Sequence, residues 1–218
     1  DCFTEEVFAS CRSASPEDVE AAVAAAQRAF ESWSATPLPE RIAAVRRVAA
    51  TLRGQADALA TAISREVGMP RKLAARIQVG APLAAWDMYA ELAAGFEWES
   101  RIGHSLVQQV PVGVAACITP WNYPLHQITG KVAPALLAGC TVVLKPSEIA
   151  PTSAFVLAEA VRQAGLPPGV FNLVHGTGPD TGEALVRHPG VDMVSFTGST
   201  RRGLAAQLQR HAFDVRTG

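Results

Sequence analysis

The chain has 218 residues, of which 49% are hydrophobic and 18% are charged, and its formal net charge is −1. This composition predicts a folded globular α/β protein and excludes an intrinsically disordered chain. The near-zero charge gives no electrostatic reason to expect nucleic acid or a membrane surface as a partner, and no apolar run is as long as a membrane span.

The four cysteines are Cys2, Cys11, Cys117 and Cys140, and no C-x-x-C pair or zinc-spaced histidine accompanies them, so we expect no metal site. Cys117 lies in an apolar segment and Cys140 at a predicted helix-to-strand joint. Both are expected to be small buried residues in a reduced, cytoplasmic protein. Apolar surroundings should raise the pKa of Cys117, which argues against a nucleophile there. The chain begins at Asp1 without a signal-like segment, which indicates N-terminal processing or a piece of a longer protein.

Helices are predicted along the first half of the chain. SPED at 15–18 starts the first, because it supplies a hydroxyl cap, a proline at the first position and acids in the first turn. Its expected buried face consists of Val19, Val23, Ala26, Phe30 and Trp33. Prolines at 37 and 39 break this pattern.

Two more helical stretches follow. The first of these carries an apolar stripe formed by Ile42, Val45, Ala49 and Leu52. It continues or restarts over residues 55–67 and ends at Gly68. The next covers residues 71–94, with a bend expected at Pro82 and core aromatic residues at Trp86 and Tyr89. Shorter periodicity over residues 96–110 predicts a hairpin or an extended arm.

Strands and helices alternate after Pro111. Strands are predicted at 112–119, 141–145, 170–174 and 193–197, and helices at 124–138, 151–164 and 181–187, with a last helix opened by residues 198–203. The spacing between the ends of successive strands is the length of a strand plus its crossover helix, which predicts a parallel sheet. We therefore expect residues 1–110 to form a helical preface with an arm, and residues 111–218 an incomplete βαβαβαβα core. Ligands of such sheets bind beyond the carboxyl ends of the strands.

The first strand runs into TPWNYP at 119–124, where two prolines flank an asparagine. They restrict the backbone and aim the side chain of Asn122 in one direction. A fixed N–H donor beside a reacting carbonyl is one half of an oxyanion hole, although Asn122 as a helix cap is the alternative. Lys131, a further candidate, either reaches back to a water near Asn122 or is a solvated helix lysine, and the second is favoured.

The second strand ends in KPSE at 145–148. The carboxylate of Glu148 suits the two hydroxyls of an adenosine ribose, and Lys145 adds hydrogen-bond donors and a positive charge. A surface Lys–Glu turn is the alternative, but such a turn does not require the fully apolar strand that precedes Lys145.

Glycines mark the other two corners. GTGPDTG at 176–182 approaches the dinucleotide fingerprint, but its last interval is one residue too long, so a simple glycine turn is the alternative. GSTRRG at 198–203 has phosphate-loop spacing without the following Lys-Ser/Thr of an NTPase. A phosphate-binding turn at a helix N-terminus and a bare strand–helix turn both stay open there.

Together these motifs are similar to the aldehyde dehydrogenase superfamily. ITPWNYP, KVAPALLAGCTVVLKPSE, AGLPPGVFNLVHGTG and HPGVDMVSFTGSTRRG resemble that family in order and spacing, as does SPEDVEAAVAAAQRAFESW near the start. The resemblance covers residues 15–203. It implies an atypical Rossmann-like parallel sheet flanked by helices, with NAD, or alternatively NADP, in its crevice.

The resemblance also implies roles for the corner residues. Asn122 matches the oxyanion donor, and Glu148 should favour NAD by repelling a 2′-phosphate, although Lys145 could offset this. The implied cofactor-binding residues are Ile118, Thr119, Pro120 and Trp121 near the nicotinamide, Lys145 and Glu148 at the ribose, Gly178 and Gly182 near the adenine, and Gly198, Ser199 and Gly203 at the pyrophosphate. Asn122, Ser147, Phe196 and Thr197 are also included in this cofactor-binding set.

In the family a cysteine thiolate attacks a small aldehyde, hydride passes to the nicotinamide, and a glutamate-activated water releases the acid. The chain stops at Gly218 before the segment E-L-G-G-K and the nucleophilic cysteine that the resemblance leads us to expect. We therefore expect a cofactor-binding portion without turnover of its own, from a family member that forms a homo-oligomer. The rivals are a non-catalytic nucleotide-binding or assembly module, which would pair through residues 96–110, and a reductase of acyl phosphates.

Overall fold

The computed structural model describes residues 1–199, and its first helix begins as the sequence predicts. The Ser15 hydroxyl accepts a hydrogen bond from the Asp18 backbone N–H (3.2 Å), and the Asp18 carboxylate accepts one from the Ser15 N–H (2.8 Å). This reciprocal capping box fixes the start of α1 (Pro16–Ala35). Ala29 takes the buried position expected for Phe30, which is half-buried.

Four further α-helices lie in the first half of the chain. They are α2 (Leu38–Gly54), α3 (Ala56–Val67), α4 (Arg71–Leu73) and α5 (Ala81–Gly95). Gly68 ends α3 in the left-handed conformation (φ 74°), which glycine adopts without strain. Among residues 1–199, no helix has both the length and the apolar character needed to cross a bilayer.

A π-helical segment, η1 (Ala74–Gly80), stands where the sequence predicted a bend. The backbone N–H of Ala81 bonds to the carbonyl of Arg76, five residues earlier. Pro82 then falls in the first turn of α5, where a residue without an N–H is tolerated. The irregularity in this helical stretch is thus a wide turn that directly precedes Pro82.

The second half forms a four-stranded parallel sheet, which confirms the predicted fold class. Its strand order is β5-β4-β3-β6, so the first strand of the alternation is central. The strands are β3 (Val114–Ile118), β4 (Thr141–Lys145), β5 (Phe171–Leu173) and β6 (Met193–Phe196). The connecting helical segments are α6 (Pro124–Ala138), α7 (Thr152–Gln163), η2 (Gly178–Gly182) and α8 (Glu183–Arg187).

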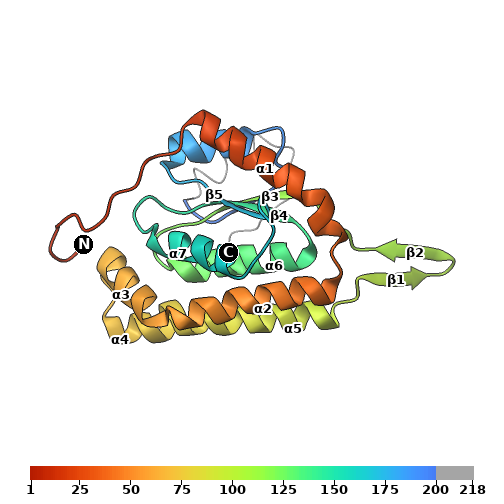
Figure 1. Ribbon diagram of the computed structural model, residues 1–218, viewed down its shortest axis with the longest axis horizontal. Helices are drawn as coiled ribbons and strands as arrows, with labels where there is room; N and C mark the ends of the chain where they lie inside the picture. Colours follow the sequence, from red (N-terminus) through yellow and green to blue (C-terminus); the bar gives the residue numbers. More distant parts are fainter. Residues whose placement is uncertain (200–218) are drawn as a thin grey trace.

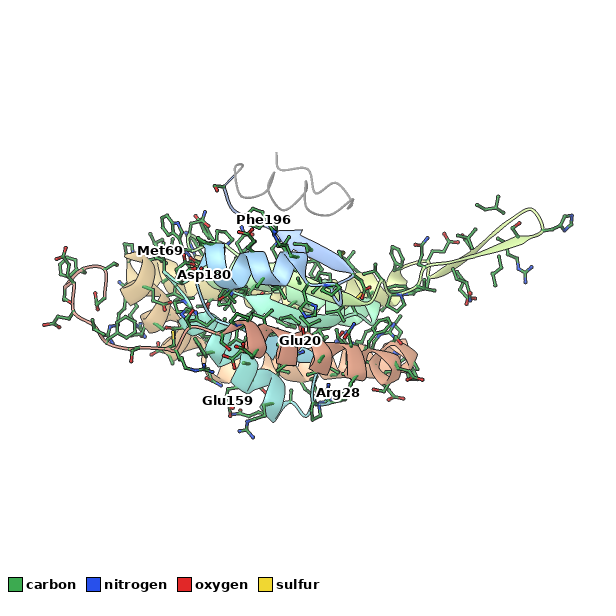
Figure 2. All side chains as sticks on the ribbon, turned by 90° about the horizontal axis from the view of Figure 1, so that it is seen from above. Glu20, Arg28, Met69, Glu159, Asp180 and Phe196 are labelled. Carbon is green, nitrogen blue, oxygen red and sulfur yellow. The ribbon has the colours of Figure 1, made fainter. Side chains whose placement is uncertain are left out.

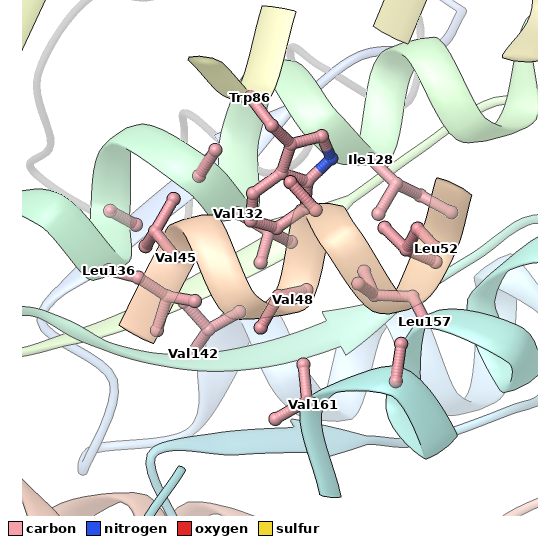
Figure 3. Packing of buried hydrophobic residues seen from close by; sticks show 14 of the residues in the cluster. Val45, Val48, Leu52, Trp86, Ile128, Val132, Leu136, Val142, Leu157 and Val161 are labelled. Carbon is pink, nitrogen blue, oxygen red and sulfur yellow. The ribbon is translucent and has the colours of Figure 1, made fainter. Parts of the chain in front are cut away.

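Helices cover both faces of this sheet (Figure 1). One face packs on α1, whose neighbour is α8, and the other packs on α6 and α7. A further layer of α2, α3 and α5 covers α6 and α7, so the chain forms two apolar cores separated by the sheet. In the larger core Trp86 lies against Val132 and Ile128 of α6, as expected for a core aromatic residue (Figure 3), and its indole N–H donates to the Thr129 hydroxyl (3.0 Å).

The arm predicted over residues 96–110 is a hairpin, which confirms the first of the two interpretations. Strand β1 (Glu99–Ile102) pairs antiparallel with β2 (Ser105–Gln108). The hairpin projects away from the helices and the sheet in both views (Figures 1 and 2). Its apolar side chains Ile102 and Leu106 are exposed.

Candidate functional site

Three of the predicted corners begin side by side at one edge of the sheet. Ile118, at the end of β3, stands in register with Lys145 of β4 on one side and with Phe196 of β6 on the other. The Thr119 N–H bonds to the Lys145 carbonyl (3.2 Å), and the Thr197 N–H bonds to the Ile118 carbonyl (3.1 Å). The strand ends therefore converge as the sequence predicts.

The corner after β3 exposes an amide whose donor end is free. The Asn122 Oδ1 accepts the Tyr123 backbone N–H (3.1 Å), while its Nδ2 group donates no hydrogen bond to any residue of the described part. The helix-cap alternative is wrong, because α6 has Tyr123 at its N-cap and no capping side chain. The Asn122 backbone carbonyl accepts a hydrogen bond from Gln78 Nε2 (2.9 Å), which ties this corner to η1.

The residues before Asn122 offer a buried hydroxyl and an exposed ring. Thr119 is buried, and its Oγ1 has no hydrogen-bond partner within residues 1–199. Pro120 is half-buried, while Trp121 leaves 48% of its surface exposed. The corner before Asn122 therefore combines a buried polar group with a partly exposed aromatic ring.

The corner after β4 contains an ion pair with one buried and one accessible member. Lys145 Nζ lies 3.2 Å from Glu148 Oε2, with side-chain exposures of 3% and 46%, and Nζ also donates to the Pro146 carbonyl (3.0 Å). The surface-turn alternative is wrong for Lys145, since its side chain is buried beneath the corner. Ser147 is also buried, and its hydroxyl accepts the Ile149 N–H (3.3 Å).

Burial and pairing determine the charge of this corner. Burial lowers the pKa of Lys145, and the neighbouring Glu148 opposes that effect. For Glu148, burial raises the pKa, but its own backbone N–H, Lys145 and the Gly178 N–H together bring it below the usual value. Glu148 is therefore an ionised carboxylate at neutral pH, with lone pairs directed into solvent.

The glycines after β5 lie beside this ion pair. Gly178 has no atoms near the position of a Cβ, whereas a Cβ on Gly182 would contact the Lys145 side chain at 3.7 Å. Gly178 opens η2 and Gly182 closes it, and Thr177 caps that segment by accepting the Asp180 N–H (3.2 Å). The predicted adenine-side glycines thus adjoin the predicted ribose residues.

The corner after β6 is only partly described. Phe196 and Thr197 are half-buried, and Gly198 and Ser199 are exposed. A Cβ on Gly198 would lie 2.5 Å from the Phe196 ring, so the ring would have to move to admit a side chain in this turn. Gly203 and the helix expected after it lie outside the described residues.

Lys131 differs from the favoured expectation of a solvated lysine, which was wrong. It is half-buried, and its Nζ donates to the Ser195 hydroxyl of β6 (3.0 Å). Burial lowers the pKa of Lys131, with Cys117 opposing. The expected burial of Cys117 and Cys140 is confirmed, and burial raises the pKa of Cys117 to about 12.

Sequence reasoning missed three polar residues at this edge. Gln78 is fully buried, and His175 follows β5, where burial and then Lys145 lower the pKa of its imidazole. Ser195 is the third, through its bond to Lys131. A polar residue inside an otherwise apolar strand, VSF, was the available signal for Ser195. Gln78 and His175 had no such signal, because their partners are distant in sequence.

Comparison with known proteins agrees with this arrangement. The sequence matches the aldehyde dehydrogenase family over residues 1–212. It is 47% identical over 201 residues to 3-succinoylsemialdehyde-pyridine dehydrogenase from Pseudomonas sp., and 41% identical over 213 residues to chloroplastic betaine aldehyde dehydrogenase from Amaranthus hypochondriacus. Each match covers 92% of this chain and 42% of the relative, so the chain spans less than half the length of either.

Solved structures give the same result. Aldehyde dehydrogenase C from Pseudomonas syringae, crystallised as a mutant with NAD+ and octanal, superimposes with a TM-score of 0.92 at 46% identity. That match covers 94% of this chain and 42% of the other. Betaine aldehyde dehydrogenase from Staphylococcus aureus, crystallised with NAD+, gives 0.91 at 33% identity and covers 95% of this chain and 43% of the other. The match in sequence and fold extends over nearly all of the described residues, and the chain belongs to the aldehyde dehydrogenase family.

Proposed function

We propose that this chain forms the cofactor-binding part of an NAD-dependent aldehyde dehydrogenase, which oxidises an aldehyde to a carboxylic acid. The observation that carries the proposal is the convergence at one sheet edge of the Lys145–Glu148 pair and of Asn122, whose amide N–H group donates to no residue within 1–199. Family membership and NAD+ in the related Pseudomonas and Staphylococcus structures support it.

The described residues fit a dinucleotide. The accessible Glu148 carboxylate can accept hydrogen bonds from two ribose hydroxyls, and the Thr119 hydroxyl, which has no partner within the described residues, can supply a buried polar contact. Open space at Gly178 leaves room for a base beside the ion pair. When bound, NAD would supply the hydride acceptor.

In this proposal Asn122 stabilises negative charge on the substrate. Attack on an aldehyde carbonyl places that charge on its oxygen, and a donor already aimed at it stabilises the transition state more than the ground state. The bond from the Tyr123 N–H to Oδ1 turns the Nδ2 group away from the backbone, and the flanking prolines limit its movement. The thiolate and the general base come from outside these residues.

Glu148 gives the sharpest test of cofactor binding. The Glu148→Gln variant loses charge-assisted hydrogen bonds to the ribose, each worth about 1.5–3 kcal/mol, so NAD affinity should fall tenfold or more. The loss should be smaller for NADP, because the variant no longer repels a 2′-phosphate. Isothermal titration calorimetry with both nucleotides measures this, with Glu31→Gln on α1 as the exposed control. Equal NAD affinity in parent and variant would contradict the proposal.

We also propose that the hairpin β1–β2 joins copies of this chain into a homo-oligomer. Ile102 and Leu106 are 69% and 52% exposed on an element that projects from the body (Figure 2). At its base lies an apolar cavity of about 310 Å³, whose lining includes Phe96 and Trp98. Exposed apolar side chains on a strand pair are suited to pairing with another chain.

Sedimentation velocity tests the assembly proposal. The double variant Ile102→Ser/Leu106→Ser should be a monomer at concentrations at which the parent is larger. Leu73→Ser, on the exposed side of α4, is the matched control and should leave the size of the parent unchanged. Measurement with and without NAD separates assembly from nucleotide binding. A parent that is itself monomeric at all concentrations would exclude assembly through this chain.

A further inference from the structure

Gln78 is a buried polar residue whose side chain makes one hydrogen bond within residues 1–199, and its acceptor lies in the corner of Asn122. Its side chain is fully buried, its Nε2 donates to the Asn122 carbonyl (2.9 Å), and its Oε1 has no partner within residues 1–199. Burying a glutamine amide costs free energy unless its hydrogen bonds are made. A surface position or an apolar residue would avoid that cost.

The π-helical turn explains how Gln78 reaches this corner. It lies within η1, the widened segment directly before α5, and η1 packs against α6. In a π-helix the side chains are rotated relative to those of an α-helix, and such turns gather at functional sites. Neighbouring Val79 is also buried, so two successive side chains of η1 point into the protein.

The Asn122 carbonyl needs a partner from outside its own helix. The first carbonyl of α6 that accepts an intrahelical hydrogen bond is that of Tyr123, from the Gln127 N–H (2.9 Å). Asn122 lies just before it, beyond the reach of the helix ladder. Gln78 therefore fixes the backbone of Asn122 while the Tyr123 N–H fixes its Oδ1.

We propose that Gln78 is a positioning residue, which holds Asn122 so that its Nδ2 group faces the substrate oxygen. This inference rests on the oxyanion role proposed above for Asn122. Two hydrogen bonds, one to the main-chain carbonyl and one to the side-chain oxygen, fix both ends of the residue and leave only the donor free. Without the Gln78 bond the corner can rotate, and the amide spends less time in the orientation that stabilises charge.

The experiment follows the Tyr123 N–H by amide hydrogen exchange in the ¹⁵N-labelled 218-residue chain. Gln78→Met keeps the side-chain volume but removes the donor, so the protection factor of Tyr123 should fall on the order of fivefold to tenfold, as expected for one lost hydrogen bond. Protection in β4, at Val143 and Leu144, should not change. Val79→Ala is the matched control, since it weakens packing in η1 but leaves the Gln78 donor in place.

Rescue by a conservative variant separates positioning from packing. In Gln78→Glu the buried carboxyl is favoured in its neutral form, whose O–H can replace the Nε2 donor. Tyr123 protection should therefore match that of the parent at low pH and decrease as the new carboxyl ionises, a dependence that Gln78→Met lacks. The proposal is overturned if Gln78→Met leaves Tyr123 protection unchanged, or if Val79→Ala lowers it equally.

The same samples titrated with NAD keep the two proposals distinct. If the parent fails to bind NAD, the proposed function is wrong, while Tyr123 protection still reports whether Gln78 holds the corner. If NAD binds and protection does not depend on Gln78, only the positioning role is wrong.

Discussion

Two lysines show what burial does at the residue scale. Lys145 follows an apolar strand, and this position alone suggested that it is not a surface residue. Lys131 lies on a helix beside an apolar stripe, and nothing nearby indicated that its ammonium would bond to Ser195, 64 positions away. Burial lowers the pKa of both groups, and the neighbouring Glu148 opposes that effect at Lys145.

Glu66 provides a prediction at this scale. Burial raises the pKa of Glu66, although the Thr152 hydroxyl and N–H (3.0 Å) donate to its Oε1, and its Oε2 is buried without a partner in the described part. The folded state thus binds the proton more tightly than the unfolded state. The stability contributed by the protonated carboxyl is fully present below the pKa that Glu66 has in the unfolded chain, near 4.5. It is lost as the pH rises through the raised pKa of the folded state.

The Glu66→Gln variant cannot ionise and should not show this loss. Its free energy of unfolding relative to the parent should increase as pH rises through that window. Urea unfolding at a series of pH values measures the difference, and Glu91→Gln on the exposed side of α5 is the control. A difference that is independent of pH would show that the carboxyl does not titrate in this way.

Helix α6 shows how an element depends on its neighbours. Its last carbonyls cannot bond within the helix, and distant side chains supply the donors. The Trp33 indole donates to Leu136 (3.2 Å), and the buried Arg41 guanidinium donates to Leu137 (3.0 Å). Gly139 then ends the helix in the left-handed conformation (φ 92°). The two side-chain hydrogen bonds connect α1 and α2 to the end of α6, directly before β4.

Gly139→Ala is the prediction for this element. The alanine would have to adopt a left-handed backbone conformation, and its Cβ would lie 3.4 Å from the Arg41 guanidinium. We therefore expect a loss of about 1–3 kcal/mol in the free energy of unfolding. Gly54→Ala, in the last turn of α2 with no atoms near its Cβ, should be neutral or stabilising by up to ~1 kcal/mol. Chemical denaturation compares the two, and equal effects would exclude the conformational explanation.

At the scale of the whole molecule, the sheet order decides which residues can act together. Because β3 is central, Asn122 lies between the corner of Lys145 and that of Phe196. The layer of α2, α3 and α5 packs on α6 and α7, and η1, which contacts α3, α5 and α6, carries Gln78 to the same corner. The helical first half therefore helps to form the site.

We expect no steady NADH production when this chain is mixed with NAD and an aldehyde. Cys117 and Cys140 are buried, and the pKa of about 12 for Cys117 leaves almost no thiolate. Cys2 and Cys11 line a cavity together with Glu66, Glu148 and Thr152, and Asn122 is not part of its lining. NADH absorbance over time is the measurement, and turnover above a protein-free blank would refute the expectation.

The sequence by itself determined the parallel alternation, most element boundaries and the corner residues, because strand and helix periodicity, glycine and proline are local signals. It also identified the family, through several motifs in a fixed order. Tertiary structure alone decided the π-helical turn before Pro82, the burial of Lys131 and the bond from Gln78 to Asn122. Each of these depends on a hydrogen bond or packing contact between segments far apart in the chain, and no local pattern of residues encodes that proximity.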